Sequence, residues 1–121
     1  MADRETVMET LRAQNARFAH PKVAASFKGW SRRMRYDFPD IGLSAAIEVA
    51  DGVPADPVEG GPGAAGASAP APAQVVYEMS SDTFLAISRK ELTGMQAYNR
   101  KLVKVKASMG DLLKLQKLDA V

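Results

Sequence analysis

Residues 98–118 read YNRKLVKVKASMGDLLKLQKL and change their hydrophobic periodicity halfway along. In residues 102–106 apolar and basic side chains alternate with a period of two, which is typical of a half-buried strand. In residues 109–118 the leucines recur at spacings of three and four, which is typical of an amphipathic helix. This stretch therefore predicts a strand followed directly by a helix, each with one apolar side that needs a partner.

The start of the chain, residues 3–18, predicts an amphipathic helix. Its apolar stripe consists of Val7, Leu11 and Phe18, with Met8 beside it. The acids lie early in this segment and Arg12 and Arg17 lie late, an order that suits the helix dipole. A second short helix is expected from Pro21 to just before Gly29, because proline suits a first helical turn and glycine suits the position after the last.

Two alternating segments follow and predict a β-hairpin. Residues 32–38, RRMRYDF, direct their methionine, tyrosine and phenylalanine to one side of a strand and their charged residues to the other. A turn containing proline and glycine leads to residues 43–49, where apolar side chains again occupy every second position. The second strand is expected to end at Asp51 and Gly52.

Residues 53–73, VPADPVEGGPGAAGASAPAPA, have a different composition from the rest of the chain. They are rich in proline, glycine and alanine, and only Val53 and Val58 are bulky and apolar. Such a segment cannot bury enough surface to offset the entropy lost on ordering it. We expect a long surface loop, with at most a short edge strand near its beginning.

Regular structure is predicted to resume at residues 74–80, QVVYEMS, which alternate as a further strand. Ser80 or Ser81 then caps a helix, and a helical turn after Gly94 leads into the stretch quoted first. Together these elements predict an α+β fold in one domain, residues 1–121. Its mostly antiparallel sheet of about four to five strands would be covered on one face by helices that enclose an apolar cavity.

The composition excludes several kinds of site. The chain has 121 residues, no cysteine and one histidine, His20, so disulfides, thiolate nucleophiles and zinc sites built from cysteines or several imidazoles are excluded. For His20 we favour a capping or surface role over catalysis. Nucleotide-binding glycine motifs and the zinc-protease motif are absent, and no cofactor is predicted. Without a long apolar run or a signal-like start, the sequence predicts a cytoplasmic protein.

Positive charge gathers in the last third of the chain. Residues 89–117 contain eight basic residues and two acids, a net charge of +6, which leaves −4 for the remainder because the whole chain carries +2. These cations either form a solvated face or attract an anion such as an acidic lipid headgroup or a coenzyme A phosphate. The predicted anion-binding residues are Lys101, Lys104 and Lys106. Nucleic acid is not an expected partner, because no aromatic residues interleave with the lysines.

Residues 80–118 resemble the end of the sterol carrier protein type 2 family. The similarity rests on FLAI at 84–87, AY at 97–98, KV at 104–105 and MG at 109–110, which match the family's helix, turn, strand and closing-helix motifs without a gap. Upstream, the first helix, the HPKVAASFKGW segment and the hairpin occur in the family's order. The resemblance thus covers nearly the whole chain, apart from the segment rich in proline and glycine.

This resemblance implies a five-stranded sheet covered by helices around a lipid tunnel. It also implies non-catalytic binding of sterols, fatty acids or fatty acyl-coenzyme A. The chain departs from the family at Lys90, Lys101 and Ala107, where glycine is usual, at Gly94, where proline is usual, and at Asp111, where an apolar residue is common. Because lysine adopts glycine's backbone conformations only at a cost, we expect the turns around the tunnel mouth to differ.

We therefore predict a carrier that binds a fatty acid, a fatty acyl-coenzyme A or a sterol-like lipid in an internal apolar tunnel. Transient contact with an anionic membrane surface or with a lipid-metabolising enzyme would deliver the ligand. The predicted ligand-binding residues combine inward phase with the family's tunnel elements: Trp30, Met34, Tyr36, Phe84, Ile87, Met95, Tyr98, Met109, Leu112 and Leu113.

Two other functions are compatible with the sequence. The chain could be an enzyme or accessory subunit that acts on a hydrophobic intermediate in a specialised-metabolite or steroid-degradation pathway. The candidate acids and bases would then be Tyr36, Tyr77, Tyr98, Asp37 and His20, although their spacing singles out no pair. Alternatively, the chain could be a protein-interaction module without a ligand, in which case its interior should be filled.

Overall fold

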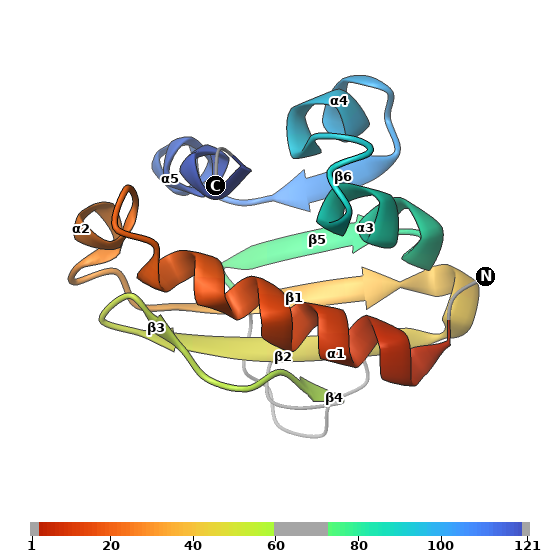
Figure 1. Ribbon diagram of the computed structural model, residues 1–121, viewed down its shortest axis with the longest axis horizontal. Helices are drawn as coiled ribbons and strands as arrows, with labels where there is room; N and C mark the ends of the chain where they lie inside the picture. Colours follow the sequence, from red (N-terminus) through yellow and green to blue (C-terminus); the bar gives the residue numbers. More distant parts are fainter. Residues whose placement is uncertain (1–2, 60–72, 120–121) are drawn as a thin grey trace.

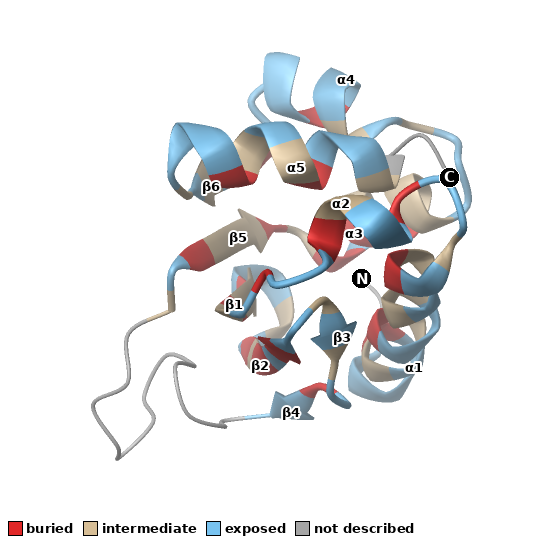
Figure 2. Cartoon of the chain, turned by 90° about the vertical axis from the view of Figure 1, so that its left-hand side faces the viewer, coloured by how far each residue is buried: buried red, intermediate tan, exposed pale blue. Residues whose placement is uncertain are grey.

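The computed structural model describes residues 3–59 and 73–119, with side chains to 118, and has an α+β fold (Figure 1). The strands are β1 (Arg32–Phe38), β2 (Leu43–Ala50), β3 (Val53–Pro54), β4 (Val58–Glu59), β5 (Val75–Met79) and β6 (Val103–Lys106). The helices are α1 (Arg4–Asn15), η1 (Ala16–Ala19), α2 (Ala24–Phe27), η2 (Pro39–Ile41), α3 (Ser81–Ser88), α4 (Gly94–Asn99) and α5 (Met109–Asp119). Figure 2 shows the α-helices on one side of the sheet, as predicted.

The sheet has the strand order β3-β2-β1-β5-β6, and β4 pairs with the same free edge of β2 as β3. The predicted hairpin is confirmed, because β1 and β2 pair antiparallel along their length from Arg32 opposite Val49 to Phe38 opposite Leu43. At the centre β1 pairs with β5 in parallel, and the other pairs in the described parts of the chain are antiparallel. The sheet is therefore mixed, although mostly antiparallel as predicted.

The predicted surface loop, residues 53–73, contains more strand than expected in the part that the structure describes. Instead of one short edge strand at most, β3 and β4 both pair with β2. Between them, the Ala55 N–H donates to the Glu48 carbonyl at 2.8 Å. Pro54 and Pro57 have no N–H to offer, which keeps both strands short. Residues 60–72 of the predicted loop lie outside the described residues.

The helices before the sheet largely follow the prediction. Asp3 caps α1 by accepting a hydrogen bond from the Thr6 N–H at 2.7 Å, and the helix continues as the tighter η1 through Phe18. The prediction for α2 was wrong at its start, because residues 21–23 form a turn and the helix begins at Ala24. Gly29, with φ of +80°, follows its last turn as expected.

The core lies between the helices and the inward face of the sheet. Side chains from α1, α2, α3 and the strands β1, β2 and β5 contribute to it, and the most deeply buried large ones are Val7, Leu11, Phe27, Met34, Phe38, Val75 and Phe84. Phe27 packs edge-on against Phe18 and Trp30, with ring centroids 5.0 and 5.2 Å apart. Such aromatic contacts add to the apolar burial that fixes α2 near the start of β1.

The helices after β5 are capped by their own side chains. Ser80 accepts a hydrogen bond from the Thr83 N–H at the start of α3, and Thr93 and Gln96 form a reciprocal capping box on α4. Lys90 and Lys101, which follow these two helices, each have φ of +61°. Altered turns were expected at these positions because lysine replaces glycine. Instead, lysine itself adopts the left-handed conformation that glycine adopts freely.

Candidate ligand-binding pocket

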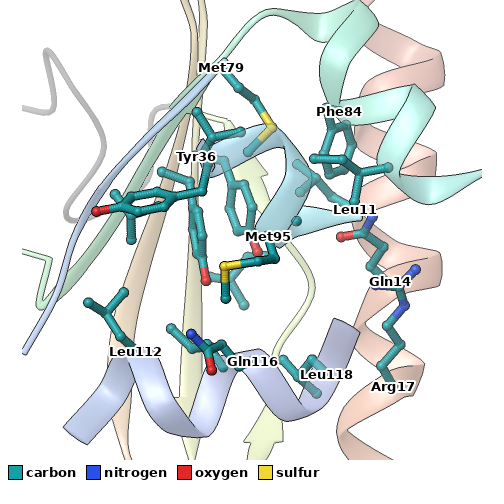
Figure 3. Close-up of a pocket in the computed structure, with 18 of the residues that line it drawn as sticks. Leu11, Gln14, Arg17, Tyr36, Met79, Phe84, Met95, Leu112, Gln116 and Leu118 are labelled. Carbon is teal, nitrogen blue, oxygen red and sulfur yellow. The ribbon is translucent and has the colours of Figure 1, made fainter. Parts of the chain in front are cut away.

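A cavity of about 340 Å³ lies between the inward face of the sheet and the helices (Figure 3). α1 and η1 form one side, α5 forms another, and α3 and α4 contribute the rest of the helical lining. Across the sheet, lining residues come from β1, β2, β5 and β6. The volume falls in the usual range for small-molecule pockets, about 300 to 1,000 Å³.

Aromatic rings form the sheet side of the pocket. Tyr36 of β1 and Tyr77 of β5 occupy opposite positions in the parallel pair, and their rings stack with centroids 5.0 Å apart. Phe84 of α3 lies against Tyr36 at 6.1 Å and against Phe38 at 5.2 Å. Such surfaces suit a hydrocarbon or a ring system and leave few polar atoms for it to desolvate.

A buried polar cluster attaches α5 beside the pocket. Asp111, which is 5% exposed, accepts hydrogen bonds from the indole N–H of Trp30 at 2.9 Å and from Nε of Arg32 at 3.0 Å. The Arg32 guanidinium also lies over the Trp30 ring, 5.5 Å from its centroid. One turn later, Lys114 donates to the Ser26 carbonyl at 2.6 Å. We call Asp111, Trp30 and Arg32 the Asp111 cluster. Together with the Lys114 contact, it links α5 to the region between α2 and β1.

The same contacts set the charge of Asp111. Burial raises its pKa, but the hydrogen bonds from Trp30 and Arg32 and the positive charge of Arg32 outweigh burial, so the pKa lies below its ordinary value of 3.8. The carboxylate is therefore ionised at neutral pH. An acid at a position where the resemblance favours an apolar residue is accommodated because all its neighbours in the cluster are donors.

The polar groups of the pocket gather on the side of α1. Gln14 and Arg17 line it there, and Gln116 of α5 also contributes (Figure 3). Asn15 is a further polar residue of the lining. Asn15 donates to the Ala55 carbonyl at 3.0 Å, whereas Arg17 has no ion-pair partner within the described residues. Among those residues no aspartate, glutamate, histidine or lysine lines the cavity. Arg17 is thus the cation that an acidic ligand would meet in this pocket.

The structure brings eight of the ten predicted ligand-binding residues to the pocket. Those eight are Tyr36, Phe84, Ile87, Met95, Tyr98, Met109, Leu112 and Leu113. Trp30 and Met34 do not line it and belong to the core cluster, where Trp30 packs against Phe18 and Phe27. Alternation predicts which face of the sheet a residue occupies but not which part of the strand reaches the pocket. Met34 shares the inward face with Tyr36 but lies two residues earlier in β1, opposite Ile47.

None of the three predicted anion-binding lysines lines the pocket. Val103 and Val105 of β6 line it, so the alternating Lys104 and Lys106 project from the other face of the sheet. Lys104 lies 3.9 Å from the Glu78 carboxylate, and Lys101 lies in the loop after α4. Sequence reasoning assigned Arg17 only to the helix dipole. Its position three residues after Gln14 and next to Phe18, on the inward stripe, was the signal that could have identified it.

The residues proposed as acids or bases are scattered. Tyr36 and Tyr77 line the pocket and Tyr98 lies at its edge, but Asp37 projects from the other face of the sheet, where it accepts hydrogen bonds from Arg35 and Ser44. His20 lies outside the lining, and its Nδ1 accepts a hydrogen bond from the Lys22 N–H at 3.1 Å. This contact lies in the turn before α2, whose N-cap is Val23, so His20 does not cap the helix.

No group of acidic and histidine side chains in the described residues could hold a metal ion. None of their helices combines the length and apolar character needed to cross a membrane.

Comparison with known proteins identified proteins of similar structure. No family model and no curated protein matches the chain. The sterol carrier protein 2 like 2 of Aedes aegypti has a TM-score of 0.62 at 16% identity, with 93% of each chain covered. A palmitated form of that mosquito protein, solved in solution, gives 0.63 at 13% identity, over 99% of this chain and 96% of the other.

A larger protein also contains this fold. The inverting sec-alkylsulfatase of a Pseudomonas species matches 98% of this chain with a TM-score of 0.64 at 16% identity, but the match covers only 16% of the sulfatase. This chain therefore spans a small part of that enzyme's length. At such identities the similarity concerns the fold alone. The chain has the α+β fold of the sterol carrier protein 2 structures.

Proposed function

We propose that residues 1–121 form a single domain that binds a hydrophobic ligand in the pocket between the sheet and α5 and transfers it without catalysis. The observation that supports this most is the cavity itself, which is lined mainly by aromatic and aliphatic side chains and carries few polar groups, gathered mostly on the α1 side. Lipid-type ligands need this combination, because an apolar body is desolvated while one polar end stays solvated or paired.

Among the ligands predicted from the sequence, we favour a fatty acid or a fatty acyl-coenzyme A over an uncharged sterol. Arg17 is half-buried and has no ion-pair partner within the described residues, so an acidic group would supply the missing counter-charge. The palmitated state of the structurally similar mosquito protein supports a fatty acid in this fold. Burial of each methylene contributes about 0.8 kcal/mol, so eight would contribute roughly 6 kcal/mol before ordering costs.

A second candidate function is suggested by the partial match to the alkylsulfatase. A fold that forms a small part of an enzyme can serve as an accessory domain that presents a hydrophobic substrate to another active site. The lining favours such a role over catalysis in the pocket itself, since no carboxylate or histidine of the described residues lines the cavity to act as a base. The cavity also argues against a protein-interaction module without a ligand, because the interior of such a module is expected to be filled.

Native mass spectrometry of the freshly purified protein, followed by extraction with organic solvent, tests the proposal. A discrete added mass that leaves on denaturation, identified as a fatty acid or acyl-coenzyme A, is the expected result. An unchanged apo mass after incubation with fatty acids, acyl-coenzyme A and sterols would contradict it.

A matched pair of variants tests the role of Arg17. Arg17→Gln is expected to weaken binding of a fluorescent fatty acid about tenfold, the usual worth of a charge-assisted hydrogen bond. Arg12→Gln removes the same charge from an exposed position on α1 outside the pocket lining and should leave binding unchanged. Equal effects of the two substitutions would show that Arg17 does not contact the ligand.

A further inference from the structure

The edge of the pocket carries large apolar side chains that remain in contact with water. Met95 and Tyr98 of α4 and Met109 and Leu113 of α5 line the cavity, yet they are between 44% and 72% exposed. We call these four residues the rim. Soluble proteins rarely gather exposed large apolar groups in one place unless a partner covers them. The rim surrounds an apolar cavity, so a partner that covered it would also face the ligand.

Cations bracket the helix that carries half of the rim. α4 itself contains no charged residue, but Arg89 and Lys90 precede it and Arg100 and Lys101 follow it. Glu91 is the single acid between residues 88 and 102, and it lies 4.0 Å from Arg89. Lys90, Arg100 and Lys101 are exposed and have no ion-pair partner among the described residues. The surroundings of α4 therefore combine apolar side chains with uncompensated positive charge.

Two of these cations are held at a conformational cost. Lys90 and Lys101 both have φ of +61°, the left-handed conformation that a residue with a side chain adopts less readily than glycine. Both follow the last turn of a helix, a position where glycine is preferred. No ion pair or side-chain hydrogen bond within the described residues compensates for this cost. Nothing in the described parts of the chain therefore gives the positive charges at these two positions a structural role.

We propose that α4, the rim and the flanking Arg-Lys pairs form a docking surface for a bilayer that contains anionic lipid. This inference rests on the proposed function and names the surface through which the ligand would be exchanged. Met95 and Tyr98 enter the interface between headgroups and acyl chains, and the Arg-Lys pairs contact lipid phosphates. A second copy of the chain fits less well, because it would bring two sets of uncompensated cations together.

Co-sedimentation with phosphatidylcholine vesicles, with and without phosphatidylserine, tests this surface. We expect binding to the vesicles that contain phosphatidylserine and a steep loss of binding as salt is raised. The double variant Lys90→Gly/Lys101→Gly should bind these vesicles roughly tenfold to thirtyfold more weakly, because each basic residue near an anionic surface contributes about one kcal/mol. The same variant should melt at a higher temperature, so its weaker binding could not result from unfolding.

A control removes equal charge from the opposite face of the sheet. Lys104→Gln/Lys106→Gln changes two exposed lysines of β6 that project away from the pocket, and it should bind vesicles as the wild type does. For the apolar contribution, Leu102→Asn changes an exposed side chain that follows Lys101, does not line the pocket and belongs to the docking surface through its backbone hydrogen bond to Ala97 of α4, so it should weaken binding severalfold. Val53→Asn, on the far edge strand β3, should have no effect.

Equal binding to neutral and anionic vesicles, or equal losses in the two double-lysine variants, would overturn the docking surface. So would self-association through the rim, detected by sedimentation velocity without vesicles. A fluorescent fatty acid measured in solution separates this inference from the proposed function. If the protein binds the fatty acid but does not bind anionic vesicles, only the docking surface is wrong. If the protein binds anionic vesicles but takes no lipid into its pocket, only the proposed function is wrong.

Discussion

Asp111 places a negative charge at one of the most buried positions of α5, and its stability contribution depends on pH. Its pKa is lower in the folded protein than its ordinary value of 3.8, because donors from Trp30 and Arg32 outweigh burial. A carboxyl group whose folded pKa is depressed stabilises the fold above its unfolded pKa, and this contribution is lost as the pH falls through the folded pKa. The Asp111 cluster should therefore weaken only in acid, below about pH 4.

Asp111→Asn is expected to lower the free energy of unfolding at pH 7 by about 1 to 3 kcal/mol. The amide keeps an acceptor for Trp30 but loses the ion pair with Arg32. Since asparagine does not titrate, the difference between variant and wild type should shrink as the pH falls below 4. Urea titrations at several pH values measure this, with Trp30 fluorescence as the signal because it is the one tryptophan of the chain. A difference that is constant with pH would contradict an ionised Asp111.

Substitutions at Lys90 and Lys101 are expected to stabilise the fold, whereas Asp111→Asn should destabilise it. Replacing either by glycine should raise the free energy of unfolding by about 0.5 to 1 kcal/mol, since relief of the left-handed conformation exceeds the extra entropy of glycine in the unfolded chain. Thermal melts of the single and double variants measure the effect. Lys106→Gly, in the regular backbone of β6, is the control and should be destabilising.

At the scale of elements, the turn between β2 and β3 is fixed by a close approach of backbones. Gly52 has φ of +76°, and a Cβ built there would lie 2.5 Å from the Phe27 carbonyl oxygen. Its N–H donates to the Trp30 carbonyl at 2.8 Å. The turn thus contacts the end of α2 and the start of β1 together, and the core aromatics depend on it.

Gly52→Ala should consequently cost about 2 to 4 kcal/mol, from the left-handed conformation and the collision with rigid backbone. Gly42→Ala separates the two causes. Gly42 also has positive φ, +62°, but a Cβ there meets nothing within 4 Å, so only about 1 kcal/mol should be lost. Chemical denaturation of both variants checks the comparison, and similar losses at the two sites would refute the close contact with Phe27.

Most elements could be predicted from the sequence because their periodicity or caps are local. The alternation of residues 32–38 and the serine before α3 are examples of such signals. The parallel pairing of β1 with β5 could not be predicted, because strand direction depends on where the intervening chain crosses. The pairing of β3 and β4 with β2 arises from the same non-local neighbours, and proline and glycine around them hide it.

The pocket shows the same division between local and non-local information. The periodicity predicted that Tyr36, Phe84 and Leu112 face inward, and all three line the pocket. The inward pattern alone could not separate Met34, which is in the core, from Met109, which is 72% exposed at the start of α5, because burial depends on which elements pack against each residue. Charge density likewise pointed to Lys101 and the two lysines of β6, whereas the topology gives the pocket its cation from η1.

For the whole molecule, the pocket implies that a ligand stabilises the fold as a unit. The cavity joins α1, α5 and the sheet, so an occupant would contact elements that are far apart in the sequence. Contacts that exist only in the folded state raise the free energy of unfolding according to ligand concentration and affinity. At a hundred times the dissociation constant the gain is about 2.7 kcal/mol, which corresponds to a melting temperature higher by roughly 10 °C for a domain of this size.

The identity of the ligand's polar end should appear in this thermal shift. In wild-type protein a long-chain fatty acid is expected to raise the melting temperature more than the alcohol of the same chain length, because only the acid supplies a counter-charge to Arg17. In Arg17→Gln the two ligands should give similar shifts, since the hydrocarbon contacts are unchanged and the charge contact is absent. Equal shifts for acid and alcohol in the wild type would mean that the ligand's polar end lies away from Arg17, toward the rim on α4 and α5.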